Sequence, residues 1–272
     1  MKPIAFDYVR PSTVAEAVSM LAGTPGAKVL AGGQTLGPML NLRLAQPTLL
    51  VDISRIPELG AVSEDKDSVT IGATVTHAAI EDGRVSDPTG GFLAGVARGI
   101  GYRAVRTRGT VGGSLAHADP AADWLSCLTA LGAEVVIAGA GPARRVRLPT
   151  FMRGALETEL GADELIVGIR IPRFSSSARF GFHKICRKAG EFADAIGVVV
   201  RDPDMAFLGA VAGATGGRPL VMEIRAVAGP RAAMTIDEAQ TLLKLVHFSG
   251  DDYELKLHAV ALKRAHDQAC AA

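Results

Sequence analysis

Two glycine pairs constrain the fold of this chain more than any other feature of its sequence. The first lies in Val29-Leu30-Ala31-Gly32-Gly33-Gln34-Thr35-Leu36-Gly37 and the second in Thr110-Val111-Gly112-Gly113-Ser114-Leu115; we call them the first and the second glycine loop. Successive amides in such a turn form an anion-binding nest, and glycine lets the backbone lie against a diphosphate where a Cβ would collide. The hydroxyls of Thr35, Thr110 and Ser114 add donors. Either loop alone favours a tight turn without a ligand, but two of one type favour a dinucleotide.

The composition is typical of a soluble globular protein with two domains. The chain has 272 residues, of which 48% are hydrophobic and 21% are charged, and its formal net charge is +1. This balance gives no reason to expect nucleic acid or an anionic membrane as a partner. Charged residues interrupt every apolar run, and the start of the chain lacks the apolar core of a secretion signal, so we expect no membrane span and a cytoplasmic location.

The cysteines and histidines predict neither a metal site nor a disulfide framework. The three cysteines, Cys127, Cys186 and Cys270, are far apart in the sequence, and no pair has the C-x-x-C spacing. Iron–sulfur clusters need four such ligands, so this chain is expected to hold no cluster of its own. His77 and His117 have no partner at the spacing of metal ligands.

Apolar periodicity predicts a mixed order of helices and strands, and therefore an α+β fold. The expected helices are residues 14–23, with Thr13 and Glu16 as a capping box, then 36–42, 91–100, a helix opened by Asp119-Pro120 that ends near 131, 236–246 and 253–269. The expected strands are residues 28–31, 49–53, 69–73, 134–138, 165–171, 195–200, 205–211 and 220–227. The second glycine loop is expected to be a turn, and residues 173–179, with three serines, are expected to be a linker.

One further glycine motif is discounted. Residues 99–104, Gly99-Ile100-Gly101-Tyr102-Arg103-Ala104, match the G-x-G-x-x-A fingerprint of a Rossmann fold. That fingerprint needs a strand before it, whereas residues 92–98 have a helical pattern.

Four motifs resemble the FAD-binding subunits of the xanthine dehydrogenase and carbon monoxide dehydrogenase family of molybdenum hydroxylases. They are Ala31-Gly32-Gly33-Gln34-Thr35-Leu36, Thr70-Ile71-Gly72-Ala73-Thr74-Val75-Thr76-His77, the long stretch from Arg106 to Asp123, and Lys184-Ile185-Cys186-Arg187-Lys188-Ala189-Gly190-Glu191-Phe192-Ala193. The likeness spans nearly the whole chain. Two segments depart from the family pattern, residues 221–233 and Glu254-Leu255-Lys256, and both lie in the C-terminal part.

The resemblance implies a two-lobed FAD-binding domain of the vanillyl-alcohol oxidase type at residues 1–174. It also implies a small antiparallel sheet-and-helix domain at residues 178–272. FAD would be bound non-covalently and extended between the lobes, with the two glycine loops on opposite sides of the diphosphate. The residues implied at the diphosphate are Val29, Leu30, Ala31, Gly32, Gly33, Gln34, Thr35, Leu36, Thr110, Gly112, Gly113 and Ser114.

Four further residues match family positions near the cofactor. Asp123 would accept hydrogen bonds from ribityl or ribose hydroxyls, or it is a first-turn charge that complements a helix dipole. Ile100 and Ile166 would lie against the cofactor rings, or they are core residues. Lys184 would place a cation near the flavin N1–O2 edge, or it is a solvated strand residue.

The resemblance implies an electron-transfer subunit with no catalytic residue of its own. A large subunit would hold the molybdopterin cofactor, a small subunit would hold two [2Fe–2S] clusters, and the assembly would be a dimer of heterotrimers. Electrons would pass from the clusters through FAD to an external acceptor. The alternative is a stand-alone flavin oxidase or reductase of the same fold. A third hypothesis is a scaffold protein that has lost its flavin.

Overall fold

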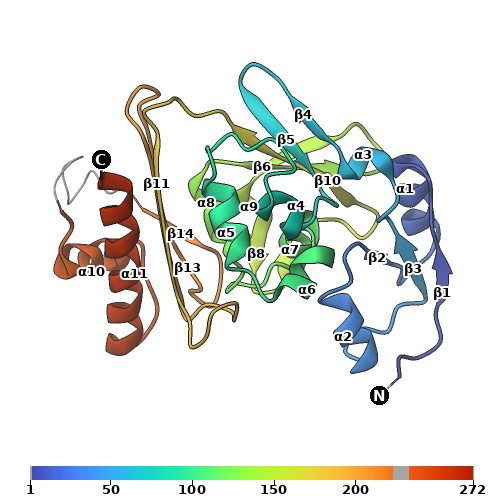
Figure 1. Cartoon of the computed structure of the whole chain (residues 1–272). Helices are drawn as coiled ribbons and strands as arrows, with labels where there is room; N and C mark the ends of the chain where they lie inside the picture. Colours follow the sequence, from blue (N-terminus) through green and yellow to red (C-terminus); the bar gives the residue numbers. More distant parts are fainter. Residues whose placement is uncertain (1, 223–232, 272) are drawn as a thin grey trace.

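The computed structural model describes residues 2–222 and 233–271, and its first lobe is a small parallel sheet. The strands β1 (Asp7–Val9), β2 (Lys28–Leu30) and β3 (Leu49–Asp52) pair in the order β1-β3-β2, and the helices α1 (Val14–Gly23), α2 (Leu36–Asn41) and α3 (Pro57–Gly60) accompany them. Ala17, Val18 and Leu21 of α1 share a core with Val51 of β3. The first glycine loop leaves the carboxyl end of β2 and leads into α2, as Figure 1 shows at the lower right.

The second lobe is a five-stranded antiparallel sheet covered by helices. Its strands are β4 (Val62–Glu64), β5 (Ser68–Gly72), β6 (Glu134–Ala138), β7 (Arg144–Arg147) and β10 (Leu165–Pro172), in the order β4-β5-β10-β6-β7. Its helices are α4 (His77–Glu81), α5 (Phe92–Arg98), α6 (Arg103–Arg108), α7 (Val111–His117), α8 (Asp123–Ala130) and α9 (Leu148–Phe151), followed by the hairpin of β8 (Met152–Gly154) and β9 (Glu157–Thr158). Trp124, Leu125 and Leu128 of α8 are fully buried in this core.

The C-terminal part is an antiparallel sheet covered on both faces. Its elements are β11 (Arg179–Ile185), β12 (Ala195–Asp202), β13 (Phe207–Gly213), β14 (Leu220–Val221), α10 (Ile236–Leu245) and α11 (Asp252–Cys270). Val198 and Val200 face the core that contains α8, whereas Val199 faces the core formed with α10 and α11. This two-sided burial explains the uninterrupted apolar run of β12. Glycines allow the close approach, since a Cβ on Gly197 would lie 2.4 Å from the Ala261 carbonyl oxygen of α11.

Most predicted elements are confirmed, and two are corrected. The second glycine loop is not a turn but the first part of α7, because the Thr110 hydroxyl accepts a hydrogen bond from the Gly113 amide and caps a helix. The Asp119-Pro120 pair does not open α8. The Asp119 carboxylate accepts instead from the Ala121 amide, in a turn that precedes the helix, and α8 begins at Asp123.

The linker between β10 and β11 is irregular but fixed to the sheet. Residues 173–178 adopt no helix or strand. The buried Asp202 carboxylate accepts from both the amide and the hydroxyl of Ser175, at 2.7 and 2.6 Å. Of the strand predicted at residues 220–227, β14 covers the start, and residues 223–227 lie outside the described residues. Among the described helices, none is both long and apolar enough to cross a membrane.

Candidate functional site

The first glycine loop presents a run of free backbone donors. The amides of residues 31–36 donate to no acceptor among residues 2–222 and 233–271. Gly33 has a φ of 71°, in the left-handed region, and Gln34 folds back so that its side-chain amide donates to the Gly32 carbonyl at 3.2 Å. A turn of consecutive amides that includes a left-handed residue has the geometry of an anion-binding nest. The loop therefore suits a negatively charged, phosphate-like group.

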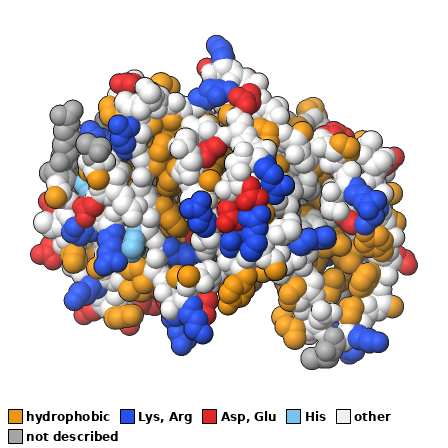
Figure 2. All heavy atoms as spheres, in the orientation of Figure 1, with side chains coloured by type: hydrophobic (Ala, Val, Ile, Leu, Met, Phe, Trp, Pro, Cys, Tyr) orange, Lys and Arg blue, Asp and Glu red, His pale blue; other side chains and the backbone are white. Residues whose placement is uncertain are grey.

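The structure brings the two glycine loops together. A Cβ on Gly32 would lie 2.0 Å from the Arg108 carbonyl oxygen and 2.9 Å from the Cα of Gly109, so the backbones touch. A Cβ on Gly113 would lie 3.9 Å from the Cβ of Ala31. Figure 2 shows the surface indented between the part that carries α2 and the central part that carries α6. The predicted convergence of the loops is thus present in the fold.

The second loop differs from the first because its amides are already paired. Val111 donates to the Val75 carbonyl at 3.1 Å, and Gly112 donates to the Ala73 carbonyl at 3.0 Å. Gly113 donates to the Thr110 hydroxyl at 3.1 Å. The expectation that both loops offer free amides therefore holds only for the first loop. The second loop can still offer the hydroxyl of Ser114, which is half-buried and has no hydrogen-bond partner among the described residues.

Gly112 has a packing role in this arrangement. A Cβ there would lie 2.6 Å from the Cβ of Ala73 and 2.7 Å from its carbonyl oxygen. The glycine lets the start of α7 sit directly on the end of β5, and the Thr76–Thr110 bridge extends the contact. The second loop is therefore a rigid wall against which the first loop rests.

Asp123 and Lys184 form a buried ion pair between α8 and β11. The Lys184 Nζ lies 3.1 Å from the Asp123 carboxylate and donates to the Gly99 carbonyl at 2.9 Å. The two side chains are 6% and 9% exposed, so the alternative that Lys184 is a solvated strand residue is wrong. Burial raises the pKa of Asp123, and the Lys184 ammonium opposes that rise. The Asp123 Oδ1 is buried and lies 3.1 Å from the same Nζ, but it accepts no hydrogen bond in the described part of the chain, because the hydrogen bond from Lys184 goes to Oδ2.

The two predicted isoleucines have different surroundings. Ile166 is 4% exposed and belongs to the main core of the second lobe. Ile100 is half-buried and packs against the edge of that core, in the irregular segment between α5 and α6.

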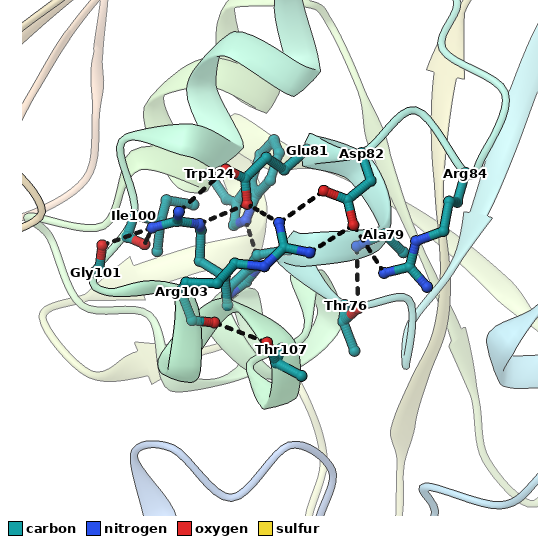
Figure 3. A network of polar contacts seen from close by, with 12 residues as sticks. Thr76, Ala79, Glu81, Asp82, Arg84, Ile100, Gly101, Arg103, Thr107 and Trp124 are labelled. Carbon is teal, nitrogen blue, oxygen red and sulfur yellow. Dashed lines mark hydrogen bonds and ion pairs between the residues drawn. The ribbon is translucent and has the colours of Figure 1, made fainter.

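A network of charged side chains lies beside Ile100 and was not predicted from the sequence. Figure 3 shows Glu81, the last residue of α4, and its C-cap Asp82 facing Arg103 of α6. Figure 2 shows acidic and basic side chains gathered at the middle of one face. Arg106, also on α6, pairs with Glu81 at 2.7 Å. Two sequence features could have indicated this network. Arg103 and Arg106 have the i, i+3 spacing of residues on one face of a helix, and two acidic residues are consecutive at positions 81–82.

His77 and Trp124 form a buried hydrogen bond beneath this network. The Trp124 indole donates to His77 Nδ1 at 3.0 Å. Burial, with a smaller contribution from Arg106, lowers the pKa of His77 to about 4. His77 is therefore a neutral acceptor that holds α4 on α8, and the described residues include no cluster of three or more possible metal ligands around it or elsewhere.

A separate hollow of about 440 Å³ lies at the linker. It is lined by residues 88–90, 174–176 and 178–180. None of these belongs to the predicted site, so the hollow is not the place where the glycine loops meet.

The fold and the site define the class: a mixed helix-and-sheet protein with a nest of free amides that suits a phosphate-like group. Residues 4–174 match the family described as the FAD binding domain in molybdopterin dehydrogenase. The chain belongs to this family, as the sequence motifs predicted, and it is an FAD-binding subunit of an oxidoreductase.

Similar proteins agree with this assignment. The chain is 38% identical to the caffeine dehydrogenase subunit beta of Pseudomonas sp. over 195 residues, which are 71% of this chain and 66% of that protein. It is 32% identical to the 6-hydroxypseudooxynicotine dehydrogenase complex subunit alpha of Paenarthrobacter nicotinovorans over 262 residues, 95% and 84% of the two chains. A structure of carbon monoxide dehydrogenase from Hydrogenophaga pseudoflava superposes with a TM-score of 0.90 at 32% identity, and covers 100% of this chain and 99% of that chain. The predicted α+β fold is confirmed at this level.

Proposed function

We propose that this chain carries FAD as the electron-transfer subunit of a heteromeric molybdenum hydroxylase. It would take electrons from [2Fe–2S] clusters on a small partner subunit and pass them to an external acceptor. A large partner subunit with a molybdopterin cofactor would act on the substrate. The observation that carries the proposal is the run of free amides at residues 31–36, held against the backbone of Arg108 and Gly109.

The residues at this place fit the diphosphate of FAD. The free amides supply donors to a negative group without a lysine, as helix N-termini and nests do. Gly32 leaves no room for a Cβ, so the backbone itself forms the cradle. The hydroxyls of Thr35 and Ser114 complete the donor set. In this proposal the first lobe and the antiparallel second lobe are the two halves of a flavin domain of the vanillyl-alcohol oxidase type, residues 1–174.

The residues on the C-terminal side fit the rest of the cofactor. The Asp123 Oδ1 contacts the Lys184 ammonium but accepts no hydrogen bond in the described part of the chain, so a ribityl or ribose hydroxyl would donate to it. The Lys184 ammonium is held at a fixed position by Asp123 and Gly99, and would favour negative charge on a nearby ring. Bound FAD would supply the ability to exchange electrons singly or in pairs. Ile100 would shield one part of the ring from water.

The same geometry disfavours a stand-alone oxidase. A flavin oxidase needs a free general base near the substrate. Asp123 and Lys184, the two ionisable groups placed at the site, pair with each other. The scattered cysteines offer no set of cluster ligands, so iron–sulfur clusters would belong to another chain. Several relatives are named as medium chains or subunits, which agrees with a complex of this kind. We infer a cytoplasmic dimer of heterotrimers.

Purification from the native source tests the proposal. We expect the chain to co-purify with two other subunits, and the complex to contain FAD, molybdenum and iron. The isolated chain should bind FAD but should not oxidise small alcohols or NADH at an appreciable rate. Recovery of the chain alone, with turnover of its own, would favour the oxidase. A colourless chain that stays colourless with added FAD would favour the scaffold hypothesis.

A further inference from the structure

The segment of residues 99–101 is held by cations on all three of its carbonyl groups. The Gly99 carbonyl accepts from Lys184 at 2.9 Å. The Ile100 and Gly101 carbonyls both accept from Arg106 Nη1, at 3.1 and 2.8 Å. Gly101 has a φ of 52°, so the chain turns here in a conformation that α5 cannot continue. The segment is irregular, yet its backbone is fixed from two sides.

Arg106 is itself immobilised by Glu81. Its Nε and Nη2 donate to the two Glu81 carboxylate oxygens at 2.7 and 3.0 Å, and its side chain is 11% exposed. All three of its nitrogens are therefore used at once, which requires the planar fork of a guanidinium. A buried ion pair is weak grounds for stability alone, because desolvation offsets much of the attraction. Its geometry, directed at one short segment, indicates a positioning role.

The same segment is where the C-terminal part meets the second lobe. The Gly101 amide donates to the Gly190 carbonyl at 3.0 Å, and a Cβ on Gly190 would lie 2.8 Å from the Gly101 carbonyl oxygen. Lys184, from β11, reaches Gly99 from the same side. A shift of residues 99–101 would therefore move Ile100 and the Lys184 ammonium together.

We propose that Arg106 is a positioning residue for the FAD site. Clamped by Glu81, it fixes residues 99–101, and through them it sets where Ile100 and the Lys184–Asp123 pair stand relative to the cofactor. This inference rests on the proposed function, because it assigns Arg106 a role toward bound FAD that the free protein does not need.

Arg103 offers a matched control. It lies on the same helix and also pairs with Glu81, at 2.7 Å, and with Asp82, at 2.6 Å. Its side chain is 52% exposed, and no hydrogen bond joins it to residues 99–101 in the described structure. Both Arg103→Lys and Arg106→Lys keep a positive charge next to Glu81, but only Arg106→Lys removes the Nη1 donor that the Ile100 and Gly101 carbonyls share.

The test measures FAD binding by the full-length variants with fluorescence titration and the visible circular dichroism of bound FAD. We expect Arg106→Lys to weaken FAD binding by about tenfold or more and to change the dichroism, since a fixed contact is lost. Arg103→Lys should change affinity by less than about twofold. Glu81→Gln, which loosens the clamp without removing the arginine, should fall between them.

The outcomes separate the inference from the proposed function. Equal FAD affinity and equal dichroism for Arg106→Lys and Arg103→Lys would overturn the positioning role alone. If Arg106→Lys does not fold, wild-type affinity in Glu81→Gln would overturn it in the same way. Wild-type chain that binds no FAD would overturn the proposed function, and this inference with it.

Discussion

Replacement of Gly32 by alanine should separate the two glycine loops. The new Cβ would lie 2.0 Å from the Arg108 carbonyl oxygen, whereas ordinary contact begins near 3.4 Å. The backbones must therefore move apart by about 1.4 Å, the difference between these distances. Neither side can yield by rotating a side chain, because both atoms in the collision belong to the backbone or are fixed to it. The carbonyl of the adjacent Gly109 is also tied to the His77 amide at 2.9 Å, so the second loop resists the shift.

The expected cost follows from this rigidity. Overpacking of a well-packed contact costs about 1–3 kcal/mol. If the whole cost appears in the free energy of FAD binding, FAD affinity should drop by about 5- to 150-fold, since 1.4 kcal/mol is a factor of ten. The first loop should take up the shift, because the amides of residues 31–36 are not tied to another described element, so the free protein should lose little stability.

Fluorescence titration with FAD, alongside thermal unfolding with and without FAD, measures both quantities. Gly23→Ala is the matched control, because it adds the same methyl group at the end of α1 where nothing lies within 4 Å. We expect wild-type affinity for Gly23→Ala and a reduced FAD-induced rise in Tm for Gly32→Ala. Equal affinity in the two variants would show that the contact between the loops does not shape the site.

Three further predictions concern buried polar groups. Lys184→Met should destabilise the chain by about 3–5 kcal/mol, because the Asp123 carboxylate is left buried without its cation; addition of Asp123→Asn should recover much of the loss in urea unfolding, and purely additive effects would contradict the pairing. His77 has a pKa of about 4, below its unfolded value near 6.5, so its contribution to stability is present above pH 6.5 and is lost as the pH falls toward 4, by up to about 3 kcal/mol. His77→Gln keeps an acceptor for Trp124 and should flatten that part of the stability–pH curve, whereas an unchanged slope would assign the pH dependence to other groups. Asp202→Asn should cost about 1–3 kcal/mol and speed proteolysis of the linker, since a carboxylate that accepts several hydrogen bonds is replaced; limited digestion followed by mass spectrometry checks it, and an intact linker would refute it.

The sequence predicted correctly those helices and strands that are stabilised by residues close to them in the sequence. The Thr13–Glu16 pattern correctly predicted where α1 begins, because the Thr13 hydroxyl accepts a hydrogen bond from the Glu16 amide at 3.2 Å. The Glu16 carboxylate, however, accepts from Ser12. The two apolar runs on either side of Asp202-Pro203-Asp204 form the hairpin of β12 and β13, as predicted. The other predicted site residues came from the family resemblance, because the glycine pattern alone is also compatible with a turn that binds no ligand.

Elements stabilised by distant partners were missed. Helix α6 has no buried residue and no apolar stripe, and ion pairs from Arg103 and Arg106 to α4 support it instead. The strands β1, β4 and β7 are short, and β4 and β7 lie at the edges of their sheet, so they lack the pattern of a buried strand. The Asp119-Pro120 signal was wrong because the Asp119 carboxylate caps a turn, which the same residue types favour equally.

The two glycine loops show why similar sequence patterns need not have the same physical role. In the first, glycine exposes consecutive amides and permits contact with Arg108. In the second, the Gly112 amide donates a hydrogen bond to the Ala73 carbonyl, and the missing side chain lets α7 pack against the end of β5. Which amides remain free depends on whether a carbonyl from another segment reaches them, and the carbonyls of Ala73 and Val75, just after β5, accept only from the second loop. One loop therefore provides the donors and the other provides the rigid surface that orients them. The proposed diphosphate site needs both, because flexible donors would lose binding energy to ordering.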